Sequence, residues 1–138
     1  MFKLVILLWI VGQVSTACAT SDKLVQGIVG QSVQLPCSYG TQDGRREVCW
    51  GRGRCSIFNC GDEILQTDGW KVTSRKSPKY QLNSPLSQGN VTLTIMDANE
   101  DDSGAYCCRI VVPGWFNDIK NNVNLQIRKG SLVDVSWV

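Results

Sequence analysis

Short segments in which apolar and polar residues alternate recur along the chain from Lys23 onward, separated by glycine, proline, asparagine, aspartate and serine. Alternation with a period of two is typical of strands that bury one face, and no segment has the longer period of an amphipathic helix. The pattern therefore predicts an all-β sandwich or barrel. The strongest strand predictions are residues 33–37, 48–50, 91–95, 105–111 and 123–127, and weaker ones are 64–67, 71–74 and 79–82.

A cysteine, a tryptophan and a second cysteine then define the type of sandwich. Cys37, Trp50 and Cys108 have the order found in an immunoglobulin core, where the tryptophan packs on the disulfide that joins the two sheets. Tyr106 lies two residues before the second cysteine, where the tyrosine corner of this fold belongs. The long interval between the cysteines leaves room for two extra strands, so we predict an immunoglobulin variable-type β-sandwich.

The N-terminal residues resemble a secretory signal peptide. Lys3 precedes the apolar run 4–11, and the small residues 17–19 follow it, which predicts cleavage after Ala19 or, less favourably, after Ala17. We expect a signal peptide at 1–19, a variable-type domain at 20–129 and a tail at 130–138. No later stretch reaches the roughly 20 apolar residues of a membrane span, so the expected mature chain is soluble. It is predicted to be secreted or to lie on the extracellular side of the plasma membrane.

Cleavage after Ala19 leaves an even number of cysteines in an oxidising compartment, which predicts three disulfides. A zinc site is disfavoured because the chain has no histidine. The six cysteines are Cys37, Cys49, Cys55, Cys60, Cys107 and Cys108.

Strand alternation places the four additional cysteines relative to the core. If Trp50 and Cys108 point inward, their neighbours Cys49 and Cys107 lie on the outer face of the same sheet. The other two cysteines, in the glycine-rich loop after Trp50, can bond to them only if that loop folds back over the sheet. A Cys49–Cys107 bridge with a local bridge inside the loop remains an alternative, because sequence alone does not determine connectivity.

Composition argues for binding rather than catalysis. The formal net charge of +2 gives no strong field for nucleic acid, so no nucleic-acid partner is expected. The chain has neither histidine nor a nucleophile motif, and every mature cysteine is expected in a disulfide, so we do not expect an enzyme.

Two aromatic residues followed by two oxygen-bearing side chains form the candidate site between the last two strands. Asn117 and Asp118 can offer hard oxygen ligands to Ca²⁺, which takes six to eight oxygens. Trp115 and Phe116, after Gly114, can enter a lipid interface. The alternative is that both rings pack on the sheet and residues 117–118 merely form a turn.

Three further features are candidates with simpler alternatives. Arg52 and Arg54 could attract anionic lipid, although such residues more often form a solvated edge. Asn90 begins a glycosylation sequon. Lys79 stands where variable-type domains usually place an arginine that pairs with the acid at Asp102.

The sequence resembles the T-cell immunoglobulin and mucin family of cell-surface phosphatidylserine receptors from residue 33 to 127. The resemblance rests on Cys49-Trp50-Gly51, the loop cysteines, Thr67-Asp68-Gly69, residues 72–77, the cysteine doublet and, above all, residues 112–118. It implies the disulfides Cys37–Cys108, Cys49–Cys60 and Cys55–Cys107. It also implies that the lipid headgroup binds in a cleft between the glycine-rich loop after Trp50 and the segment between the last two strands. A Ca²⁺ ion would there bridge protein and lipid.

The resemblance has a limit and a competing interpretation. Family members continue into a mucin stalk and a transmembrane helix, which this chain lacks, so we expect a fragment, a truncated product or a soluble form. The competing interpretation is a protein-binding immunoglobulin-type domain without lipid or metal. Other cell-surface immune receptors would then be its partners.

Overall fold

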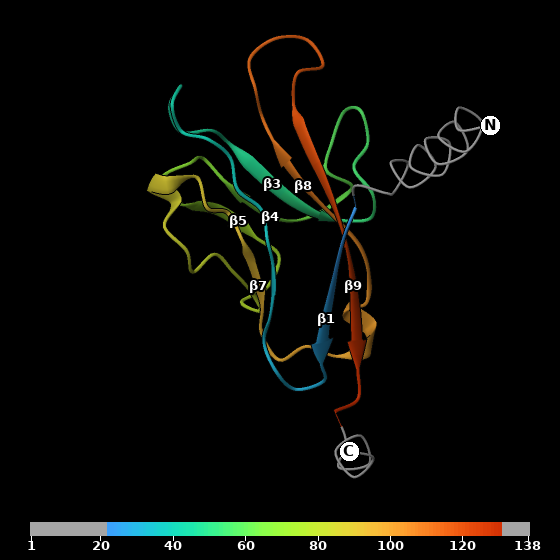
Figure 1. Ribbon diagram of the computed structural model, residues 1–138. Helices are drawn as coiled ribbons and strands as arrows, with labels where there is room; N and C mark the ends of the chain where they lie inside the picture. The colour runs from blue at the N-terminus through green and yellow to red at the C-terminus, as the bar shows by residue number, and fades with distance from the viewer. Residues whose placement is uncertain (1–21, 131–138) are drawn as a thin grey trace, which may run out of the picture.

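The computed structural model describes residues 22–130, which form two β-sheets packed face to face (Figure 1). The larger sheet has the strand order β1-β9-β8-β3-β4-β5, and the smaller has the order β2-β7-β6. All pairs are antiparallel except β1 and β9, which run parallel. This is the predicted variable-type immunoglobulin sandwich. The predicted signal peptide and the end of the predicted tail lie outside the described residues.

All eight predicted strands are present in the structure, with shifted ends. Only the first strand was not among the predictions. The strands are β1 (Lys23–Ile28), β2 (Val33–Leu35), β3 (Val48–Arg52), β4 (Asp62–Thr67), β5 (Val72–Arg75), β6 (Tyr80–Gln81), β7 (Leu93–Ile95), β8 (Gly104–Ile110) and β9 (Ile119–Arg128). Two short 3₁₀ helices, η1 (Leu86–Gln88) and η2 (Glu100–Asp102), complete the described elements. Neither is long and apolar enough to cross a membrane.

The core lies between the sheets, where the predicted cysteine pair and tryptophan meet. Cys37 and Cys108 form a disulfide, and both are buried with Trp50. The indole N–H of Trp50 donates a 2.8 Å hydrogen bond to the carbonyl oxygen of Val91, so its one polar atom is satisfied inside the core. This arrangement joins the two sheets covalently and fixes their relative position.

The corner before β8 also has the predicted geometry. The hydroxyl of Tyr106 donates a 2.6 Å hydrogen bond to the carbonyl oxygen of Asp102, which confirms the tyrosine corner. Burial raises the pKa of Tyr106 because the interior disfavours the phenolate. The Nζ atom of Lys79 lies 2.8 Å from a carboxylate oxygen of Asp102, which confirms the expected ion pair. These contacts anchor the start of the strand that leads to the candidate site.

Candidate functional site

Two loops meet at one end of the larger sheet. Strands β3 and β8 pair with Val48 opposite Ile110 and Arg52 opposite Tyr106. The loop 111–118 therefore leaves β8 at the Val48 end, whereas the loop 53–61 leaves β3 at the other end. Loop 53–61 must double back along the sheet to approach loop 111–118, and Figure 1 shows it turned upward, toward the end of the sheet that carries loop 111–118.

Two disulfides hold loop 53–61 against the outer face of the sheet. Cys49 bonds to Cys60 and Cys55 bonds to Cys107, as the family resemblance implied, and the alternative pairing is not formed. Gly51 allows the close approach, because a Cβ atom there would collide with the carbonyl oxygen of Cys60. The parity argument for a loop folded over the sheet is thus confirmed.

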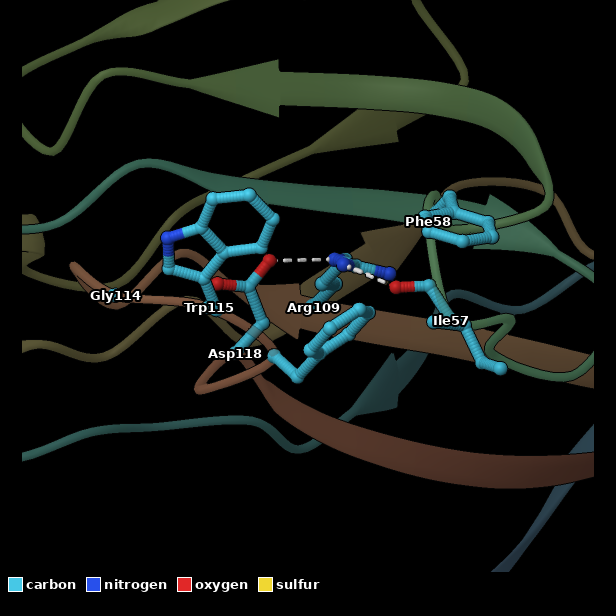
Figure 2. Close-up of a pocket in the computed structure, with 7 residues that line it drawn as sticks. Ile57, Phe58, Arg109, Gly114, Trp115 and Asp118 are labelled. Carbon is cyan, nitrogen blue, oxygen red and sulfur yellow. Dashed lines mark hydrogen bonds and ion pairs between the residues drawn. The ribbon is translucent and has the colours of Figure 1, made fainter.

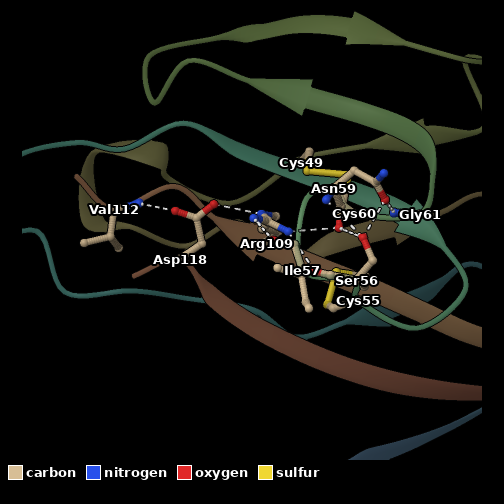
Figure 3. Close-up of polar contacts among 11 residues, drawn as sticks. Cys49, Cys55, Ser56, Ile57, Asn59, Cys60, Gly61, Arg109, Val112 and Asp118 are labelled. Carbon is tan, nitrogen blue, oxygen red and sulfur yellow. Dashed lines mark hydrogen bonds and ion pairs between the residues drawn. A yellow bond between two sulfur atoms is a disulfide. The ribbon is translucent and has the colours of Figure 1, made fainter. Parts of the chain in front are cut away.

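Arg109 makes a third, non-covalent connection between the loop and the sheet. Its Nη1 donates to the carbonyl oxygens of Ser56 and Asn59 at 2.8 and 3.0 Å, and its Nη2 donates to that of Ile57 at 2.7 Å. Its Nε donates to Asp118 Oδ2 at 2.8 Å. Figure 3 shows Arg109 between Asp118 and the tip of loop 53–61. Arg109 is only 8% exposed. One nearly buried guanidinium therefore ties the tip of loop 53–61 to the end of loop 111–118.

The carboxylate of Asp118 is the acidic group of the site. Its Oδ1 accepts a 2.9 Å hydrogen bond from the backbone N–H of Val112, and its Oδ2 accepts the bond from Arg109. The Val112 N–H and the Arg109 guanidinium favour the ionised form, so they hold the pKa of Asp118 below its usual range. The side chain is therefore a carboxylate at neutral pH, and its orientation is fixed by one contact from loop 111–118 and one from β8.

The backbone of loop 111–118 turns tightly and presents its aromatic rings outward. Gly114 has φ 109°, and Phe116 has φ 59°, a left-handed conformation that is uncommon for a bulky residue. The Asn117 amide nitrogen donates a 3.0 Å bond to the Pro113 carbonyl oxygen across the turn. Trp115 and Phe116 are 88% and 69% exposed, so neither ring packs on the sheet as the alternative interpretation predicted.

A cleft of about 460 Å³ opens between the two loops. Figure 2 shows the Arg109–Asp118 ion pair between Trp115 on one side and Phe58 on the other. The walls are mostly apolar and the floor is charged, which suits a ligand with a polar head and an apolar body. The lining residues are Ile57, Phe58, Arg109, Gly114, Trp115, Phe116 and Asp118.

The donors available for a cation come from two consecutive residues. The Asp118 oxygens each accept one hydrogen bond, which leaves further lone pairs on both. The Asn117 amide donates through its nitrogen, so its oxygen remains an acceptor, although Asn117 is not among the cleft-lining residues. Within residues 22–130 no three His, Cys, Asp or Glu side chains gather as a metal cluster. The donor set fits a calcium ion that takes its remaining oxygens from backbone, water and ligand.

The other predicted site residues lie away from the cleft lining. Arg52 donates to the Ser103 carbonyl oxygen at 3.0 Å and stacks 4.8 Å over the Tyr106 ring, and Arg54 lies 2.6 Å from Asp22. Both arginines are at the base of loop 53–61, not at its tip. The predicted sequon residue Asn90 is half-buried, and its side-chain oxygen accepts the Thr92 N–H at 3.2 Å.

Sequence reasoning missed Arg109, Ile57 and Phe58. The signal for Arg109 was present, because it follows Cys107 by two positions and must share its outer face. The tip residues lie midway between Cys55 and Cys60, where a folded-back loop has to be farthest from its anchors. Their approach to loop 111–118 depends on the loop's three-dimensional path, which no local pattern encodes.

A family model for the immunoglobulin V-set domain matches residues 20–128. T-cell immunoglobulin and mucin domain-containing protein 4 of Mus musculus is 46% identical over 136 residues, which are 95% of this chain and 39% of that protein. The Homo sapiens protein of the same name is 46% identical over 113 residues, 81% of this chain and 30% of its own length. The chain thus spans less than half the length of these relatives.

Two solved structures share the fold at high sequence identity. The structure described as Tim-4 in complex with phosphatidylserine is 49% identical with a TM-score of 0.75, covering 78% of this chain and all (100%) of that one. The Tim-1 structure is 44% identical with a TM-score of 0.79, covering 82% of this chain and 97% of that one. Each of the two structures therefore matches most of this chain.

Proposed function

The chain belongs to the T-cell immunoglobulin and mucin domain family, and from that premise we propose that its extracellular immune-receptor domain binds phosphatidylserine, as exposed on apoptotic cells or other membranes. The lipid headgroup enters the cleft between loops 53–61 and 111–118. The observation that carries the proposal is a charged Arg109–Asp118 floor beneath outward-facing aromatic rings. A relative with 49% identity whose structure is described as a complex with this lipid supports it.

The cleft offers each part of the lipid a matching environment. The headgroup carries a phosphate, a carboxylate and an ammonium group, so a site with both a guanidinium and a carboxylate can pair with either sign of charge. The amphipathic ring of Trp115 and the apolar ring of Phe116 are both more stable at the interface between headgroups and acyl chains than in water. Because the loop holds these rings outward before binding, ordering them costs little on contact.

We further propose that Asn117 and Asp118 hold a Ca²⁺ ion together with the lipid. The ion would supply positive charge to the anionic groups of the headgroup. The residues' own role is to keep a carboxylate ionised and oriented: the Val112 N–H and the Arg109 guanidinium do this for Asp118, whose pKa is lowered accordingly. The Pro113 carbonyl oxygen orients the amide of Asn117.

The test is titration of the purified domain with phosphatidylcholine vesicles that do or do not contain phosphatidylserine, in calcium and in EDTA. Binding should require both the lipid and calcium. Asn117→Ala should weaken it at least about tenfold, since one metal ligand is lost while the Arg109 contact is kept. Asp118→Ala should abolish it, and circular dichroism checks the fold of that variant.

Other results would reject parts of the proposal. Binding that EDTA leaves unchanged, with both variants active, would rule out the metal site. No vesicle binding at all, together with capture of a cell-surface protein, would favour the protein-binding interpretation.

A further inference from the structure

The tip of loop 53–61 carries two apolar residues that face solvent. Ile57 is 55% exposed and Phe58 is 79% exposed. Large apolar side chains at the rim of a functional cleft mark an interaction surface more often than scattered surface residues do. Both residues line the cleft, but neither side chain has a charged or polar group that could bind the metal or pair with the headgroup charges.

The loop cannot fold so as to bury them. Cys55 and Cys60 fix both sides of the tip by disulfides, and Arg109 binds the carbonyl oxygens of Ser56, Ile57 and Asn59. Ser56 Oγ also lies 2.8 Å from Asn59 Oδ1, closing the turn beneath the tip. The exposure of Phe58 is therefore imposed by covalent and hydrogen-bonded constraints on its neighbours.

The exposed rings of the two loops are continuous across the cleft. The Phe58 and Phe116 ring centroids lie 6.3 Å apart, and those of Phe116 and Trp115 lie 6.5 Å apart, both within the range of interacting aromatic pairs. Figure 2 shows Phe58 on the opposite side of the Arg109–Asp118 pair from Trp115. An apolar rim thus stands on both sides of a charged slot.

We propose that loop 53–61 is a second membrane-inserting element, in which Phe58 and Ile57 enter an anionic bilayer together with Trp115 and Phe116. This inference rests on the proposed lipid-binding function. A bilayer presents anionic headgroups directly above hydrocarbon, so it complements a charged slot between two apolar tips better than a uniformly polar protein surface does. The disulfides then serve to hold Phe58 at membrane depth rather than only to wall the cleft.

The first experiment replaces one exposed apolar residue at a time. Phe58→Ser should weaken calcium-dependent binding to phosphatidylserine vesicles roughly tenfold, because an aromatic side chain no longer leaves water. The matched control is Leu24→Ser on β1, where the side chain is 65% exposed but does not line the cleft; binding should stay within about twofold. Unchanged thermal unfolding of both variants shows that the fold is intact, as the exposure of both positions predicts.

A second measurement reports depth directly. Phe58→Trp should bind at least as well as the wild type, and brominated acyl chains should quench its fluorescence more than they quench that of Leu24→Trp, since native tryptophans are common to both. Equal quenching in the two variants would overturn the proposal.

Three further outcomes separate the possibilities. Wild-type binding with undiminished binding by Phe58→Ser overturns the second anchor but leaves the proposed function standing. Failure of the wild type to bind vesicles overturns both. Loss of self-association, rather than of vesicle binding, in Phe58→Ser would assign the tip to contact between two copies of the chain and overturn membrane insertion.

Discussion

At the scale of single residues, Arg109 determines the geometry of the cleft floor. Its guanidinium donates hydrogen bonds to three carbonyl oxygens of loop 53–61 and to the carboxylate of Asp118 at the end of loop 111–118. A guanidinium satisfies such a set because its donors are fixed in a planar fork, which a lysine ammonium lacks. Asp118 is oriented by the same contact, so the cleft floor is formed before any ligand arrives.

Arg109→Gln should lower the free energy of unfolding by about 2–3 kcal/mol, because several nearly buried carbonyl oxygens and a carboxylate lose their partner. Urea unfolding followed by tryptophan fluorescence measures the change. The control is Arg52→Gln, since Arg52 also donates to backbone carbonyl oxygens but in a more exposed setting, and its loss should cost less than about 1 kcal/mol. Equal effects of the two substitutions would contradict the special role of Arg109 in holding the two loops together.

The residue types at the site could be predicted from sequence better than their contacts could. Trp115 and Asp118 were identified from their order in one short segment, and both line the cleft. Arg52 was selected for its charge and position before the loop cysteines, yet it lies at the base of loop 53–61. Charge and proximity in sequence do not say which end of a folded-back loop a residue occupies. That depends on the disulfides and on the sheet register.

At the scale of elements, loop 53–61 is held by two covalent bridges of different span. Cys55–Cys107 closes 52 residues, whereas Cys49–Cys60 closes 11. Both lie on the outer face, so neither contributes to joining the two sheets, which Cys37–Cys108 does. The bridges can therefore be removed separately while the sandwich keeps its central disulfide.

Removing the longer bridge with Cys55→Ser/Cys107→Ser should lower the free energy of unfolding by about 4 kcal/mol, against about 3 kcal/mol for Cys49→Ser/Cys60→Ser. The difference follows from the greater entropy that the longer closure removes from the unfolded chain. Calorimetric unfolding of the two double variants and the wild type measures the order. Vesicle binding should fall in both variants, because Phe58 and the cleft wall lose a constraint. A larger loss of stability from the shorter bridge would contradict the entropic account.

Alternation predicted every described strand except β1, although β5 (Val72–Arg75) also has no fully buried residue. In β1 (Lys23–Ile28) no residue is fully buried, so its sequence lacks the contrast between a core face and a solvent face. Its strand conformation comes from parallel pairing with β9, a partner distant in sequence. Strand β9 likewise starts earlier than predicted, at Ile119, because the polar residues before Val123 pair with β8 without entering the core.

At the scale of the whole molecule, the apolar and charged groups of the candidate site gather at one end of the larger sheet. Strand β9 begins at Ile119, directly after loop 111–118, and runs to Arg128 at the opposite end of the sheet (Figure 1). Under the proposed function, the molecule would present a narrow tip, not a broad basic face, to a membrane. With a formal net charge of only +2 for the whole sequence, general electrostatic attraction to a membrane would be weak beside the proposed calcium binding and insertion.

Because the net charge is small, we predict that vesicle binding depends only weakly on the concentration of monovalent salt. Arg52 and Arg54 lie at the base of loop 53–61 and already contact Ser103 and Asp22, so any lipid role is a long-range attraction rather than a contact. The double variant Arg52→Gln/Arg54→Gln should bind phosphatidylserine vesicles within about threefold of the wild type at roughly 0.15 M salt, where the Debye length is about 8 Å. At about 0.01 M salt, where screening extends to about 30 Å, the difference should grow. A tenfold loss that persists at the higher salt would instead place these guanidinium groups against the headgroups, and the tip would then have to lie tilted on the membrane.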